Sequence, residues 1–210
     1  MALATVEGGH PARRTETEVE TAMPASTRSS EALHDAALEL IAESGLNALT
    51  LVAVAERAGV SRATAYREFN DKDGLIGAVA RSEVAKMVAA AYSEIDLFAP
   101  IASIVGSVTL FALSYLRQHR AFDYIRRHEP TWLLDVAITH DGTEVNLVQT
   151  VAALAAPVVT MREGDLNLPP LAAAEVVVRI VLSHILLAHS NLTDDQIAET
   201  AIRAVSRPAP

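Results

Sequence analysis

The 210-residue sequence contains no cysteine. This absence excludes disulfide bridges, thiolate zinc sites and a cysteine nucleophile together, and it is consistent with a reducing cytoplasm. Residues 1–14 also lack the basic start and apolar run that mark a signal peptide. We therefore expect a cytoplasmic protein rather than a secreted one.

The chain has no obvious membrane-spanning segment. Its most apolar stretch, Val176 to Ala188, covers 13 residues and contains Arg179 and His184. Because a membrane span needs roughly 20 apolar residues, this stretch predicts a buried helix, and we expect no membrane partner. Half of the residues are apolar, which is enough for one large domain or for a small and a larger one.

The sequence also lacks an excess of positive charge. It has 17 basic and 26 acidic residues, a formal net charge of -9, and residues 1–28, 29–90 and 91–210 are each acidic overall. A basic domain is the usual indication of nucleic-acid binding. Any such function must therefore depend on the local placement of a few basic side chains.

No stretch alternates apolar and polar residues as a half-buried strand does, and no internal repeat is evident. Apolar residues recur at helical steps of three and four instead. We expect an all-α fold, in which Gly45 and Gly59 end helices in the left-handed conformation and Pro157 bends one. After an arm over residues 1–28, helices are predicted at about 30–44, 51–58, 62–68, 72–93, 100–118, 120–128, 131–138, 143–163, 170–189 and 194–205.

Residues 50–69 predict a helix-turn-helix. Thr50 and Ser61 stand where each can cap a short helix, and the two helices meet at Gly59. One small core is predicted to contain Leu51, Ala55, Val60, Ala65 and Phe69. The outer side of the second helix carries Arg62, Ala63, Tyr66 and Arg67.

The stretch LTLVAVAERAGVSRATAYREFNDKDGL, residues 49–75, resembles the DNA-binding signature of the TetR family of transcriptional regulators. The resemblance rests on Ala-x-x-x-Gly-Val-Ser through the turn, Thr-x-Tyr on the next helix, and Phe-x-x-Lys-Asp-x-Leu after it. It implies a three-helix head with a helix-turn-helix, residues 29–75, joined to a larger helical domain for ligand binding and dimerisation, residues 76–210. About nine or ten helices are expected in all.

The resemblance assigns DNA contacts to Thr50, Ser61, Arg62, Thr64, Tyr66, Arg67 and Lys72, and the methyl group of Ala63 suits thymine. Arginines in the major groove reach phosphates or guanine edges, and the helix starts at Thr50 and Lys72 offer backbone N–H groups to phosphate. Glu68 departs from the family pattern. Its side chain is expected to face solvent, to accept a hydrogen bond from a cytosine amino group, or to exclude some DNA sequences by repulsion. A few correctly placed hydrogen-bond donors are thus enough for an acidic chain to bind DNA.

The resemblance further implies a homodimeric repressor that binds a near-palindromic operator and is released by a small-molecule effector, which the sequence does not identify. No other cofactor is expected. Effector-pocket candidates, which suit an ordinary core equally well, are Phe98, Phe111, Tyr115, Trp132, Met161 and His184. Since the last two helices are apolar around much of their circumference, the dimer interface is expected at Ala173, Val177, Ile180, Val181 and His184.

We expect no catalytic or metal-binding residues, and hence no enzyme. The chain has neither a P-loop nor a Gly-x-Ser-x-Gly motif. His184 and His189 do not share a helix face, and His140 with Glu144 would need further ligands. Two alternatives stay open: an all-α small-molecule-binding protein or enzyme with a vestigial helix-turn-helix, and a DNA-binding activator or ligand-independent factor.

Overall fold

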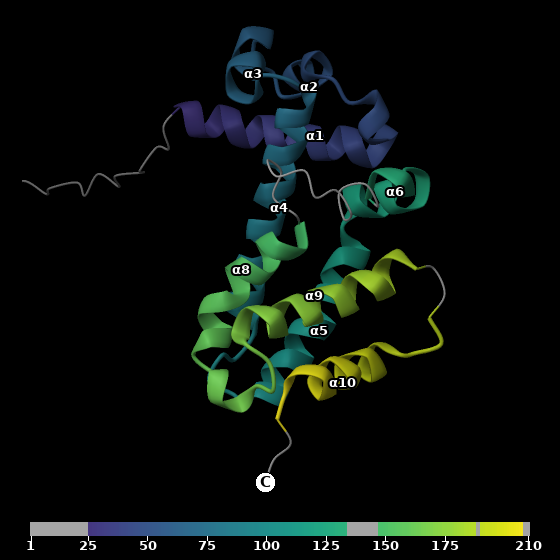
Figure 1. The fold of residues 1–210 in the computed structure, drawn as a ribbon. Coiled ribbons are helices and arrows are strands. Elements are labelled where there is room, and N and C mark those ends of the chain that lie inside the picture. Colours follow the sequence, from purple (N-terminus) through teal and green to yellow (C-terminus); the bar gives the residue numbers. More distant parts are fainter. Residues whose placement is uncertain (1–24, 134–146, 188–189, 208–210) are drawn as a thin grey trace, which may run out of the picture.

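The computed structural model describes residues 25–133, 147–187 and 190–207 (Figure 1). These residues are mostly helical, and their extended structure is limited to an isolated bridge between Leu166 and Ser206. The all-α prediction is confirmed. The elements are α1 (Ala25–Ala48), α2 (Leu51–Arg57), α3 (Arg62–Phe69), α4 (Lys72–Glu94), α5 (Ile101–Gln118), α6 (Arg120–His128), α8 (Leu147–Thr160), the 3-10 turn η1 (Glu163–Asp165), α9 (Pro170–Leu186) and α10 (Asp194–Val205).

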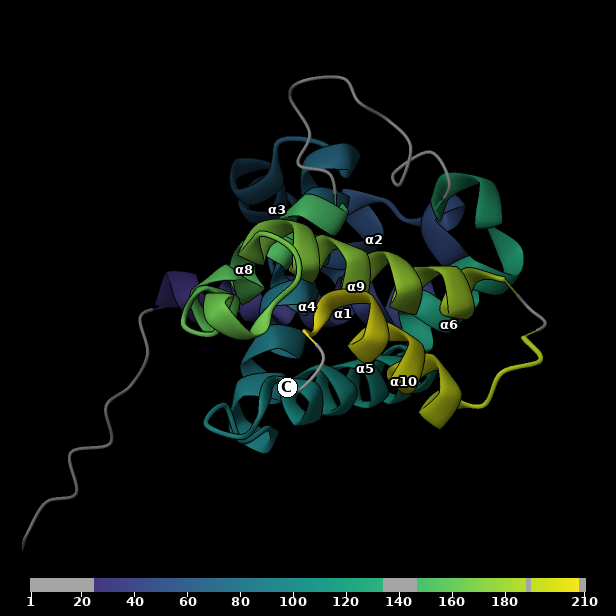
Figure 2. The ribbon, with the colours of Figure 1, turned by 60° about the horizontal axis from the view of Figure 1, so that its bottom comes forward.

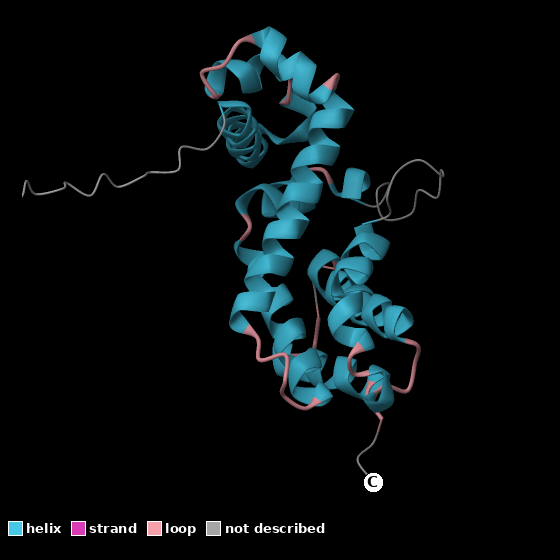
Figure 3. Cartoon of the chain, turned by 90° about the vertical axis from the view of Figure 1, so that its left-hand side faces the viewer, coloured by secondary structure: helices cyan, strands magenta, loops and turns pink. Residues whose placement is uncertain are grey.

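Helices α1, α2 and α3 form a head at one end of the molecule (Figure 1). Helix α4 begins in the head and extends into the body, which contains α5, α8, α9 and α10 (Figure 1). Both parts are built of helices joined by loops (Figure 3). Helix α6 packs against α1, and α9 lies between α8 and α10 (Figure 2). The predicted boundary between residues 75 and 76 falls inside α4, which continues through it without a break.

The predicted capping residues account for several helix starts. Thr50 Oγ1 accepts from the Ala53 N–H at 3.1 Å, and Ser61 Oγ accepts from the Thr64 N–H at 3.1 Å. At α4 the cap is Asp71, whose carboxylate accepts from the Gly74 N–H at 2.8 Å. Each cap satisfies an amide that has no partner in the first turn of its helix.

Both glycines predicted to take positive φ angles do so. Gly59 has φ 67° between α2 and α3, and Gly45 has φ 77° within α1. Asn70 also has a positive φ, 64°, which was not predicted, and its amide donates to the Asp71 carboxylate at 2.8 Å. Pro157 lies inside α8, and the bend expected there stays a prediction.

The break at Gly45 leaves two backbone N–H groups outside regular helical hydrogen bonding, and Glu129 takes both. Its Oε2 accepts from the Leu46 N–H at 3.0 Å, and its Oε1 accepts from the Asn47 N–H at 3.1 Å. A carboxylate that accepts hydrogen bonds from two backbone N–H groups makes charge-assisted hydrogen bonds, which are stronger than neutral ones. The end of α6 is thereby attached to the head.

The hydrophobic core of the head continues into α6. Leu33, Val54 and Phe69 are buried there in one cluster with Ala121 and Ile125 of α6. This packing adds apolar contact to the two hydrogen bonds of Glu129. Helix α6 therefore contacts the head as closely as a member of it would.

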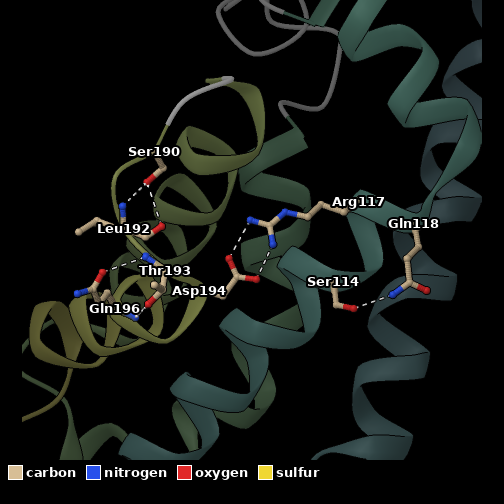
Figure 4. A network of polar contacts seen from close by, with 8 residues as sticks. All are labelled: Ser114, Arg117, Gln118, Ser190, Leu192, Thr193, Asp194 and Gln196. Atoms are coloured by element: carbon tan, nitrogen blue, oxygen red, sulfur yellow. Dashed lines mark hydrogen bonds and ion pairs between the residues drawn. The ribbon is translucent and has the colours of Figure 1, made fainter.

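A polar network joins α5 to the start of α10 (Figure 4). The Arg117 guanidinium donates to the Asp194 carboxylate through both of its terminal nitrogens, one of them at 2.9 Å. Thr193 and Gln196 form a capping box at the same helix start. Since Arg117 and Asp194 are both partly exposed, the pair fixes the position of α10 more than it adds to stability.

Helix α5 is long and apolar enough, by length and composition alone, to span a membrane. In this fold it instead packs against α4, α6, α9 and α10. Its residues Ile104, Val105 and Leu113 are buried. Helix α5 is therefore accounted for as a packed helix of the body.

The two positive-φ glycines provide a matched test of the junction at Glu129. A Cβ at Gly45 would lie 2.4 Å from Glu129 Oε1 and 2.6 Å from Tyr124 Cε1, whereas a Cβ at Gly59 would meet nothing within 4 Å. Gly59→Ala should lower the free energy of unfolding by about 1–2 kcal/mol, because alanine is strained in the left-handed conformation. Gly45→Ala should lower the free energy of unfolding by roughly 1–3 kcal/mol more, because the added Cβ would crowd the side chains of Glu129 and Tyr124. Urea unfolding measures both, and equal losses would contradict the described contact.

Candidate DNA-binding surface and interior cavity

Helix α3 divides into the two faces predicted from the sequence. Ala65 is fully buried and Phe69 is 6% exposed. On the other side Tyr66 is 51% exposed, and Arg62, Ala63 and Arg67 are exposed as well. The helix therefore presents two guanidinium groups and a phenol to solvent together, which is the arrangement needed for an element that enters the major groove. DNA contact by these residues stays a prediction.

The two arginines of this face differ in their surroundings. Arg62 Nη2 lies 2.7 Å from Glu56 Oε1, in a pair that is 64% and 62% exposed. An ion pair so exposed contributes little, so a phosphate or base can replace Glu56 at small cost. Arg67 forms no salt bridge within the described part of the chain.

The acidic groups nearest the turn are partly neutralised by Arg57. Its guanidinium lies 3.2 Å from the Glu39 carboxylate and 2.9 Å from that of Glu43. Hydrogen bonds to these carboxylates raise the pKa of Arg57, and its hydrogen bond to Glu43 lowers the pKa of that carboxyl. Two of the acidic residues of α1, Glu39 and Glu43, are therefore paired with a cation of α2.

The remaining predicted DNA-contact residues are committed to local hydrogen bonds. Ser61 Oγ lies 2.9 Å from Thr64 Oγ1, and both Ser61 and Thr50 cap helices. Lys72 Nζ donates to the Asn47 carbonyl at 3.3 Å. The expectation of an open helix start at Lys72 is wrong in one respect: the Asp71 carboxylate caps α4, so a negative group stands where a phosphate was expected.

The body contains a cavity of about 330 Å³, lined by α4, α5, α6, α8 and α9 together with side chains of α1. Of the predicted pocket residues, Phe111, Tyr115 and Trp132 line it. Phe98 and Met161 do not; they are 84% and 73% exposed. His184 is also absent from the cavity wall. The prediction was wrong for these three because bulk and polarity do not reveal the direction of a side chain.

The cavity wall contains one ionisable cluster that the sequence did not indicate. Glu83 of α4 lies 2.9 Å from His119 Nε2 and 2.8 Å from Lys86 Nζ. The hydrogen bond from His119, followed by that from Lys86, lowers the pKa of Glu83 to about 2. His119 Nδ1 accepts from the Phe122 N–H at 3.1 Å and so caps α6.

The predicted dimer residues of α9 turn mostly toward their own subunit. Ala173, Val177 and Val181 line the cavity, and Ala173 and Val181 are 2% and 5% exposed. Ile180 packs against the interior of the body, and His184 is half-buried. Three of the five predicted interface residues therefore line the cavity, and the dimer interface itself stays a prediction. Their i, i+4 stripe is indistinguishable, in an apolar sequence, from one that faces a partner.

The metal-site candidates His140, Glu144 and His189 lie outside the described residues. Residues 25–133, 147–187 and 190–207 contain no group of three histidine or acidic side chains that could hold a metal ion. The sequence did not predict the role of Glu129 in linking the head to the body, because its partners lie 82 and 83 positions away. No local pattern marks such a contact.

Comparison with known proteins bears on the head and on the fold. Residues 33–79 match the family model described as bacterial regulatory proteins, tetR family. No curated protein sequence matches the chain. Among solved structures, the similarity extends over most of the chain at low sequence identity.

Three of these structures are transcriptional regulators. The repressor QsdR of R. erythropolis is 20% identical with a TM-score of 0.59, over 89% of this chain and 100% of that one. AlkX of Dietzia is 23% identical with a TM-score of 0.63, over 82% and 93%. FadR of Bacillus subtilis is 14% identical with a TM-score of 0.57, over 82% and 95%. Residues 33–79 therefore match the N-terminal domain of the TetR family of bacterial regulatory proteins, and the chain as a whole shares the fold of these three regulators.

Proposed function

We propose that this protein is a cytoplasmic transcriptional repressor that binds a near-palindromic operator as a homodimer and releases it when a small molecule occupies the cavity. The observation that carries the proposal is the joint presence of an exposed cationic helix face and an apolar cavity, with α6 lining the cavity and packed against α1 of the head. An isolated DNA-binding module would need no such cavity, and a simple carrier would need no such helix.

The DNA-binding part of the proposal rests on α3. Arg62 and Arg67 can reach guanine edges or phosphates from the major groove, and the Tyr66 hydroxyl can donate to a phosphate. A two-fold dimer would place two such helices about 34–36 Å apart, one turn of B-DNA. The net charge of -9 lowers nonspecific affinity, which depends on phosphate neutralisation.

The dimer would use the sides of α9 and α10 that remain exposed. These sides carry Arg179 and Ser183 on α9, and Glu199 and Arg203 on α10. They are more polar than the face first expected. Polar residues around apolar neighbours are ordinary at an interface between subunits.

Release by an effector requires a physical connection from the cavity to the DNA-binding face. Phe122 and Ile125 of α6 line the cavity, and Glu129, just after α6, accepts from the Leu46 and Asn47 amides. The Asn47 carbonyl in turn accepts from Lys72. A ligand that displaces α6 would therefore shift the head and Lys72 together.

The similar structures do not point to one effector. AlkX is implicated in the biodegradation of n-alkanes, and the FadR structure is a complex with stearoyl-CoA. An uncharged hydrocarbon and an anionic thioester differ in nearly every property that a binding site recognises. The ligand of this protein must therefore be inferred from its own cavity.

The rival function is an all-α carrier or enzyme with a vestigial helix-turn-helix. It shares the cavity with the proposed repressor and differs in the role of α3. Ligand binding or turnover without any affinity for duplex DNA at low salt would favour it. A reporter placed behind the upstream region of the gene separates repression from activation.

Arg67→Ala should weaken binding to duplexes selected from a randomised library by about 1–3 kcal/mol, because a base or phosphate contact is lost. Lys72→Ala should weaken binding to all duplexes alike and reduce the salt slope by about 1. Arg127→Ala, at a 62% exposed arginine of α6, is the control. Fluorescence anisotropy at several salt concentrations measures all three, and unchanged binding in the first two contradicts the assigned face.

A cavity-filling substitution should imitate the effector. Ala112 lines the cavity from α5, whereas Ser107 of the same helix is exposed. Ala112→Trp should weaken operator binding about fivefold or more, in the range of known coupling energies, and Ser107→Trp should not. Adding Glu129→Ala should shrink the effect of Ala112→Trp, as in a double-mutant cycle. An effect that is the same with and without Glu129 contradicts the proposed route. Urea unfolding of each variant identifies losses that come from misfolding.

A further inference from the structure

The cavity lies along α4. Its wall on this helix is a stripe at helical spacing that runs from Ile76 to Ile95, which at 1.5 Å per residue spans roughly 28 Å. The cavity volume is about 330 Å³. At roughly 30 Å³ for each water-sized unit, the volume corresponds to about eleven non-hydrogen atoms.

The wall is mainly aliphatic, formed by valine, leucine, isoleucine and alanine side chains from at least five helices. Among the described residues, few of those that line the cavity carry a polar or titratable group: Glu83, Tyr92, Tyr115, His119 and Trp132. The state of these five groups bears on which polar group a ligand can bring into the cavity.

Three of the five are already satisfied within the protein. Both Glu83 oxygens accept, one from Lys86 and the other from His119 Nε2–H. His119 is fixed in this tautomer because its Nδ1 accepts from an amide. The Tyr92 hydroxyl donates to the Leu154 carbonyl at 2.8 Å. Among the described residues of this wall, an ionic ligand headgroup would therefore find no unpaired counter-charge, which makes its burial strongly unfavourable.

The other two groups are donors. Among the described residues, neither the Tyr115 hydroxyl nor the Trp132 indole N–H has a hydrogen-bond partner. Burial raises the pKa of the Tyr115 phenol, which keeps it protonated and able to donate at neutral pH. A donor in an apolar wall is complementary to a neutral acceptor.

We propose that the cavity takes an uncharged, mainly aliphatic molecule of about eleven non-hydrogen atoms, with a carbonyl, ether or hydroxyl oxygen that accepts from Tyr115 or Trp132. The proposal gives the chemical class of the ligand on which the proposed function depends. It excludes amphiphiles whose carboxylate or ammonium group would enter the cavity.

Three probes of matched chain length test it: 2-decanone, decanoate and decylammonium. Trp132 is the single tryptophan of the chain and lies on the cavity wall, so its fluorescence reports binding directly, and calorimetry gives Kd. We expect 2-decanone to bind at least about tenfold tighter than either ion, because each ion loses its hydration without gaining a partner. Equal or tighter binding of an ion, or no binding of the ketone up to its solubility, overturns the proposal.

Tyrosine variants locate the ligand's oxygen. Tyr115→Phe should weaken 2-decanone binding about three- to tenfold, the value of one hydrogen bond. Tyr92→Phe removes a hydroxyl that is already bonded within the protein, and it should leave the affinity unchanged. If Tyr115→Phe and Trp132→Phe both leave the calorimetric Kd unchanged, the assignment of the acceptor is wrong.

The ligand class and the proposed function fail separately. Cavity binding is measured without DNA, and operator binding is measured by anisotropy. Tight ketone binding that leaves operator affinity unchanged would support the ligand class and contradict effector release. Operator release by a charged molecule that binds in the cavity would support the repressor and overturn the ligand class.

Discussion

The carboxylate of Glu129 and the two amides that it binds fix how the head of this molecule meets its body. The contact exists because Gly45 takes a positive φ and interrupts α1, which turns the Leu46 and Asn47 amides away from their helical acceptors. An extra carbon at Gly45 would collide with the same carboxylate. Apolar packing of α6 against α1 surrounds these hydrogen bonds, so head and body share one core across their junction.

The sequence was sufficient where structure depends on neighbouring residues. Thr50 and Ser61 cap the helices that their chemistry predicts, and Gly59 makes the turn between them. Residues alternate between the buried and exposed sides of α3 as the helical period requires. These features follow from interactions within three or four positions, which explains why the helix-turn-helix was predictable in detail.

Prediction failed where the answer depends on packing between distant segments. Helix α9 is apolar on more than one side, and its period alone does not tell a stripe that faces the cavity from one that faces another subunit. Val177 and Val181, predicted for the interface, line the cavity. Phe98 and Met161 have the bulk of pocket residues but stand in solvent. The partnership of Glu83 with His119 joins positions 36 apart, and each residue is unremarkable in its own segment.

Helix α4 belongs to two parts of the molecule at once. Lys72 at its first turn lies beside the head, and Ile95 just past its last turn lies on the cavity wall. The 23 residues of this helix make a rod of roughly 34 Å. A tilt of about 5° around one end of such a rod moves the other by roughly 3 Å, which is the length of a hydrogen bond. A change too small to rearrange the interior can thus carry an ammonium group out of reach of a phosphate.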